Sequence, residues 1–259
     1  MSGEATHPKV SSLVEPNEDA ESIFHLGDDD AYERALGVLA ILTDRLMDTV
    51  KEMSDDDVRR PSLLPDWSRG HVLTHIARNA DGACNLVEWA ETGNETPMYA
   101  SPEARKADIE AGAGRSASEL ESDVESSGER LLARIADLPV GRRHIEVRSS
   151  TGQMVPAHEL LWWRMREVAY HHVDLDAGYR FEDLPDAVLL RGLDEAVERV
   201  AAAGAPSLRL AATDLDWTSG TEGAEVSGRA SDLLAWLTGR SDGEGLRAEH
   251  ALPQLPAWG

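Results

Sequence analysis

The sequence has 259 residues, of which 41% are hydrophobic and 28% are charged, and its formal net charge is −23. The length predicts one large domain or two modest ones with a sizeable core. The negative charge argues against nucleic acid and anionic membrane surfaces as partners, because both attract clustered Lys and Arg. The single cysteine, Cys84, excludes an intramolecular disulfide and a Cys-rich zinc site, and its apolar neighbours favour a buried residue over a nucleophile.

The chain shows no targeting or membrane signal. It has no run of about 18 apolar residues, and no basic segment followed by an apolar one at its start. We therefore expect a cytoplasmic protein without a transmembrane helix.

The N-terminal part is predicted to be a tail followed by a long helix. Residues 1–29 are polar, acidic and aperiodic, and we expect a flexible tail. Apolar residues then recur at helical spacing over residues 31–53. The predicted buried stripe consists of Leu36, Val38, Leu39, Leu42, Leu46 and Val50.

A second helix is predicted from about Arg69 to near Glu91, with Ser68 as its N-cap. His71 and His75 lie four residues apart and therefore on one face of this helix. The spacing is compatible with metal binding, but it is weak evidence without the glutamate of an H-E-x-x-H motif.

Two further helices and a hairpin precede the next motif. A short helix is expected over about residues 102–112, and a longer one within residues 116–138. Alternating polar and apolar residues around Gly152 predict a small hairpin or an extended loop. Pro156 is expected to start the next helix, which would end near Gly178.

This last helix carries Glu167 and His171, one turn apart on one face. A carboxylate and a neutral imidazole are half of a metal site, and His75 is the best candidate for the third ligand, with His71 as an alternative. Three such ligands suit a divalent ion such as zinc and leave positions open for water or substrate. Sites of this kind are built inside helical bundles from inward-facing side chains.

A structural interpretation of the same residues stays open at this point. His171 would then be a hydrogen-bonded core residue, and Glu167 would pair with Arg164 or Arg166. Asp174 and Asp176 are candidates to orient a ligand imidazole, although solvation of the helix end explains both equally well.

From residue 183 onward the pattern changes to helix, strand, strand and helix. The predicted helices cover residues 186–202 and 229–240, and the predicted strands lie within residues 207–218 and 224–228. This segment is predicted to form a second, smaller α/β unit.

Two motifs together resemble a known family. L-P-D-W-S-R-G-H-V-L-T-H-I-A over residues 64–77 and R-M-R-E-V-A-Y-H-H-V-D-L-D-A-G over residues 164–178 look like those of the mycothiol-dependent maleylpyruvate isomerases. These enzymes belong to the DinB-like four-helix-bundle superfamily. The resemblance extends to residues 105–115 and 226–240.

The resemblance implies an α+β fold with a DinB-like metal-binding bundle over residues 30–182 and a small C-terminal α/β domain, sterol-carrier-like, over residues 183–259. The flexible acidic tail expected over residues 1–29 departs from the family pattern.

The resemblance also implies a site. A divalent metal, usually zinc, would be held by His75, Glu167 and His171, and mycothiol would be the thiol cofactor. Arg240 is the expected match to an arginine that the C-terminal domain contributes to catalysis. Arg78 is a second candidate for catalysis, and Asn79 is a candidate for cofactor binding.

The implied reaction is the cis-trans isomerisation of maleylpyruvate to fumarylpyruvate through thiol addition and elimination, a step of gentisate degradation. The expected partners are a small dicarboxylate and a low-molecular-weight thiol, with no nucleic acid and no membrane. Two alternatives share the metal ligands or the fold: a mycothiol S-transferase that conjugates the thiol to an electrophile, and a non-catalytic metal-binding DinB-like protein. The oligomeric state is left open.

Overall fold

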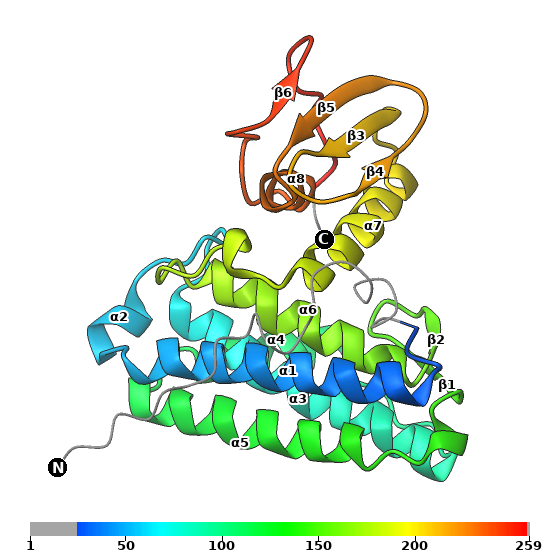
Figure 1. The fold of residues 1–259 in the computed structure, drawn as a ribbon. Helices are drawn as coiled ribbons and strands as arrows, with labels where there is room; N and C mark the ends of the chain where they lie inside the picture. Colours follow the sequence, from blue (N-terminus) through cyan, green and yellow to red (C-terminus); the bar gives the residue numbers. More distant parts are fainter. Residues whose placement is uncertain (1–24, 258–259) are drawn as a thin grey trace, which may run out of the picture.

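Four long helices lie side by side in the computed structural model, which describes residues 25–257, and a smaller unit lies above them (Figure 1). The four helices are α1 (Asp29–Lys51), α3 (Arg69–Thr92), α5 (Ala117–Ala136) and α6 (Glu159–Asp174). Both α3 and α1 pack against α5 and α6, which closes a four-helix bundle. The predicted α+β fold is confirmed.

Short elements connect the bundle helices. They are α2 (Asp55–Arg59), α4 (Pro102–Gly112), the 3-10 helix η3 (Val140–Arg142) and the strands β1 (Glu146–Arg148) and β2 (Met154–Pro156). A second 3-10 helix, η4 (Phe181–Asp183), lies between α6 and the smaller unit. The two strands pair antiparallel, which confirms the predicted hairpin around Gly152. Gly152 has a φ of 88°, a conformation that other residues rarely adopt.

The smaller unit combines two helices with a four-stranded sheet. Its elements are α7 (Asp186–Ala202), β3 (Leu208–Ala212), β4 (Thr218–Ser219), β5 (Ala224–Gly228), α8 (Ala230–Leu237) and β6 (Arg247–Ala248). The strand order is β4-β3-β5-β6, in which β3 and β5 are parallel and the outer pairs are antiparallel. The domain division between residues 182 and 183 falls just before α7, and it stays a proposal.

The apolar stripe predicted for the first helix is buried along its whole length. The exposed fraction of its side chains is 9% or less at Leu36, Val38, Leu39, Leu42, Leu46 and Val50. The helix begins at Asp29 because the Asp28 carboxylate accepts a hydrogen bond from the Ala31 amide. Leu26 is also buried, so folded chain begins before residue 29. The rest of the predicted tail, residues 1–24, lies outside the described residues.

The predicted start of α6 is wrong. Pro156 is the last residue of β2, where it lies opposite Glu146, and the helix begins at Glu159. Proline is tolerated at the edge of a ladder because it only lacks a donor there. The helix also ends at Asp174 rather than near Gly178, and the strand β6 was not predicted.

Among residues 25–257, no helix is long and apolar enough to cross a membrane.

Candidate metal centre

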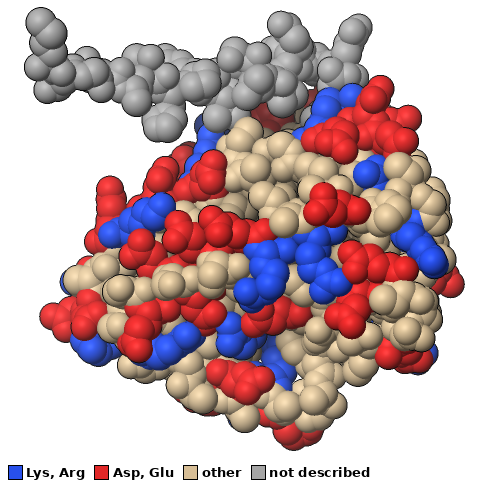
Figure 2. Space-filling model, turned by 90° about the horizontal axis from the view of Figure 1, so that it is seen from below, with Lys and Arg blue, Asp and Glu red and all other residues tan. Residues whose placement is uncertain are grey.

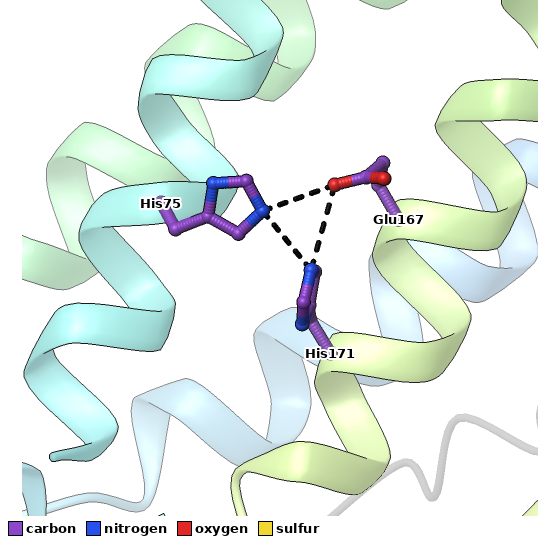
Figure 3. A group of neighbouring side chains, drawn as sticks. All are labelled: His75, Glu167 and His171. Atoms are coloured by element: carbon purple, nitrogen blue, oxygen red, sulfur yellow. Dashed lines mark hydrogen bonds and ion pairs between the residues drawn. The ribbon is translucent and has the colours of Figure 1, made fainter. Parts of the chain in front are cut away.

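His75, Glu167 and His171 point toward one another from two helices, and we call them the His–Glu–His cluster (Figure 3). His75 Nε2 lies 3.1 Å from Glu167 Oε2 and 3.0 Å from His171 Nε2. His171 Nε2 lies 3.5 Å from Glu167 Oε2. Atoms bound to a tetrahedral zinc ion at their usual distances lie roughly 3.3–3.6 Å apart, so the three atoms come close to the corners of such a site.

The start of α3 determines which histidine faces α6. The Ser68 hydroxyl accepts from the His71 amide, and the His71 ring accepts from the Ser68 amide at 3.1 Å, which forms a reciprocal cap. His71 is thereby engaged at the helix end, and its Nε2 lies 3.5 Å from Glu110. His75, one turn later, is 4% exposed and reaches the cluster.

The other ring nitrogen of His171 faces a carboxylate. His171 Nδ1 lies 2.8 Å from Asp174 Oδ2, and Asp174 is fully buried. Arg240, from the segment after α8, donates from Nε and Nη2 to the two Asp174 oxygens at 2.8 Å each. Asp174 therefore fixes the ring of His171, as carboxylates do behind metal-bound histidines, and Arg240 fixes Asp174.

The other ring nitrogen of His75 faces a cation instead. The Arg105 guanidinium on α4 lies 3.1 Å from His75 Nδ1, and since arginine only donates, Nδ1 is the acceptor. A cation bound at Nε2 requires the proton on Nδ1, so binding would end this contact. No spacing rule singled out Arg105, because its role depends on how α4 packs against α3.

The surroundings of the two cluster histidines shift their pKa values in opposite directions. Burial, together with the nearby His171, lowers the pKa of His75 to about 4. Burial also opposes charge on His171, but hydrogen bonds to Asp174 and Glu167 outweigh it and raise the pKa of that ring. Burial likewise opposes charge on Glu167, yet its hydrogen bonds with His171 and His75 hold its pKa well below the usual range.

This donor set fits a divalent cation. An ionised carboxylate and two imidazoles suit a borderline metal such as zinc, and Asp174 supplies the acceptor behind one ring. The structural interpretation is weaker, because Arg166 lies 3.7 Å from Glu167 while the two histidines lie closer. Arg164, the other partner that the structural interpretation offered for Glu167, forms no ion pair within the described residues. Ligand roles for the cluster nevertheless stay a prediction.

A pocket of about 320 Å³ adjoins the cluster, and we call it the α6 pocket. Glu167 is the cluster residue that lines it, and Ser150 and Thr151 at the tip of the β1–β2 hairpin line it too. Asn79 also lines it, as predicted for a ligand-binding residue, although its role is untested. Trp163 lines the pocket as well.

Arg78 lies in an ion-pair network between α3 and α5. Its Nη2 lies 2.6 Å from Asp123 and 3.0 Å from Asp81. On the face of the molecule that is seen from below, basic side chains lie among acidic ones (Figure 2). The network engages Nη2 of Arg78, while its buried Nε has no hydrogen-bond partner among residues 25–257, and its catalytic role stays a prediction.

Comparisons with known proteins give a consistent result. Residues 39–176 match a family model described as the mycothiol maleylpyruvate isomerase N-terminal domain. The crystal structure of the mycothiol-dependent maleylpyruvate isomerase superposes with a TM-score of 0.82 and 31% identity, over 88% of this chain and 97% of that chain. The crystal structure of a histidine-to-alanine mutant of that isomerase gives the same values. No curated protein matches the sequence.

Proposed function

Since the chain belongs to the mycothiol-dependent maleylpyruvate isomerase family, we propose that it catalyses the mycothiol-dependent isomerisation of maleylpyruvate to fumarylpyruvate. The observation that carries this proposal is the His–Glu–His cluster beside the α6 pocket. The cluster offers a place for an ion, and the pocket offers a place for the substrate next to it.

His75, Glu167 and His171 would hold the divalent ion, with zinc as our choice, and its positive charge would favour the thiolate form of a bound thiol. Mycothiol would supply the nucleophile that adds to the cis double bond, so that rotation and elimination give the trans product. The protein's own part is to hold these groups in place. Asp174 orients His171, and the partly exposed Glu167 stays ionised and available as a ligand.

The pocket would bind and orient the dicarboxylate. Ser150 and Thr151 line it with hydroxyl groups, and Asn79 lies on its wall, where we keep it as a residue that contacts the cofactor. Arg240 acts on the cluster through Asp174 in this proposal, rather than through the substrate. We place the enzyme in the cytoplasm, where low-molecular-weight thiols are kept reduced.

The test follows the absorbance of maleylpyruvate with purified protein, with and without mycothiol. We expect thiol-dependent conversion to fumarylpyruvate that disappears in His75→Ala. The matched control is His71→Ala, one turn earlier on α3, which should keep its activity. Absence of thiol-dependent conversion by the wild type would refute the proposal, and accumulation of a stable thiol adduct would indicate an S-transferase.

A further inference from the structure

Other arginines with little exposed surface have a carboxylate partner. The buried Arg69 and Arg143 form ion pairs with Asp57 at 3.9 Å and with Asp29 at 3.0 Å, and Arg240, whose side chain is 8% exposed, forms one with Asp174 at 2.8 Å. Arg164 is more deeply buried than Arg69 or Arg143, at 4% exposed, yet it forms no ion pair with any residue of the described chain. Such a group is costly to bury, because a guanidinium loses its hydration without gaining an opposite charge.

The contacts of Arg164 use only one side of its guanidinium. Nη1 donates to the Ile76 carbonyl at 2.9 Å and to Asn79 Oδ1 at 3.0 Å, and both acceptors are neutral. Within residues 25–257, no hydrogen bond engages Nε or Nη2 of Arg164. These two nitrogens form the edge of the fork that arginine uses for bidentate binding of a carboxylate.

Arg164 lies in the wall of a pocket, where a ligand can reach its unpaired nitrogens. Arg164 lines the α6 pocket together with Glu167 of the cluster. The other two arginines of the pocket wall, Arg166 and Arg199, both form ion pairs with Glu195. Within the described residues, Arg164 is therefore the arginine of the pocket wall that forms no ion pair. It lies in the pocket where the reaction is proposed to take place.

We propose that Arg164 binds a carboxylate of the substrate in the α6 pocket, with Asn79 holding its guanidinium in position. The substrate class is a small dicarboxylate, so this inference rests on the proposed function. Arg240 and Arg78, which the sequence favoured for the task, form ion pairs with Asp174 and with acidic residues of α3 and α5. Burial lowers the pKa of Arg164 to about 10, which leaves the group charged at neutral pH.

Asn79→Asp tests the proposal without removing the arginine. The new carboxylate would pair with Arg164 from inside the protein and so compete with the ligand. We expect binding of maleate to the metal-loaded full chain, measured by calorimetry, to weaken at least about tenfold. Asn94→Asp adds the same charge in the exposed segment after α3 and should leave maleate binding unchanged.

Arg164→Met and Arg164→Lys complete the series. We expect Arg164→Met to lose at least about tenfold in maleate affinity, and Arg164→Lys to recover part of it, because lysine keeps the charge but not the fork. Wild-type protein that does not bind maleate, or Asn79→Asp and Arg164→Met variants that bind it within twofold of wild type, would overturn the inference. If maleate binding depends on Arg164 but maleylpyruvate is not isomerised, the proposed function fails while this inference stands.

Discussion

Arg164 on α6 and Arg240, which binds Asp174 at the end of α6, are two cations with little exposed surface, and they differ in what faces them. Arg240 meets the buried Asp174 carboxylate with two hydrogen bonds of 2.8 Å. Within the part of the chain that the structure describes, Arg164 donates hydrogen bonds only to the Ile76 carbonyl and the Asn79 side chain. Arg240 therefore has a carboxylate partner inside the protein, whereas Arg164 has neutral partners and still lacks an opposite charge at hydrogen-bonding distance within the described residues.

The difference shows how one face of a helix can carry both a structural ion pair and a binding residue. The Asp174–Arg240 pair connects the C-terminal unit to His171 and so fixes the orientation of the His171 ring in the cluster. Arg164 keeps a positive charge at the pocket wall at a cost in stability, which a bound carboxylate would offset. Where a buried charge lacks its partner inside the protein, the partner is expected to be a ligand.

The largest expected effect compares Arg240→Met with Arg164→Met. Removing Arg240 leaves the Asp174 carboxylate buried without its cation, and we expect unfolding free energy to fall by about 3–5 kcal/mol. Arg164→Met removes an uncompensated charge together with its two hydrogen bonds, so the change should stay within about 1 kcal/mol. Denaturant unfolding of both variants measures the difference. Equal losses of unfolding free energy would contradict the assignment of a structural role to Arg240 and a binding role to Arg164.

Acid unfolding extends the comparison to two neighbouring histidines. His171 faces carboxylates, whereas burial and the nearby Arg45 lower the pKa of His172 to about 4. His172 is 1% exposed, stacks on Tyr179 and bonds to Thr49. Below the ordinary pKa of about 6.5, His172 binds a proton in the unfolded state, whereas in the folded state it does so only near its lowered pKa of about 4. The free energy of unfolding should therefore fall by up to about 3 kcal/mol between pH 6.5 and pH 4.

The variant that isolates this effect is His172→Gln, measured by denaturant unfolding at several pH values. Its stability should depend less steeply on pH over that window than that of the wild type, while His250→Gln in the exposed C-terminal segment should behave as the wild type. An unchanged slope in His172→Gln would assign the acid sensitivity elsewhere.

The smallest expected effects concern the second ring nitrogens of the two cluster histidines. Asp174→Asn should weaken divalent metal binding by about 10- to 100-fold, since it removes the acceptor behind His171. Arg105→Met should strengthen binding by a few-fold, because it removes a positive charge next to His75. Competition with a chromophoric chelator measures both affinities, and changes of the same sign would contradict the roles assigned here.

The helices and the cluster could be predicted because their signals are local. Periodic apolar residues and the Ser68 cap located α1 and α3, and the four-residue spacing placed Glu167 and His171 on one face. Spacing could not show that His75 faces them, and the family resemblance supplied that expectation. Pro156 misled the prediction because a helix start and a strand edge both tolerate its missing donor.

The partners of the arginines could not be predicted from the sequence. Asp174 and Arg240 lie 66 residues apart, and Arg164 and Asn79 lie 85 residues apart. Which arginine is paired and which is free depends on how α6 packs against α3 and the C-terminal unit. The sequence therefore favoured Arg240 and Arg78 for the substrate, whereas the contacts favour Arg164.

The metal content of the purified protein tests the site most directly. Elemental analysis of wild-type protein prepared without chelators should give one equivalent of a divalent ion per chain. Glu167→Gln and His171→Ala should lose it, while His71→Ala should keep it. Wild-type protein without a stoichiometric divalent ion, or Glu167→Gln and His171→Ala variants that retain one, would contradict a metal centre at the His–Glu–His cluster.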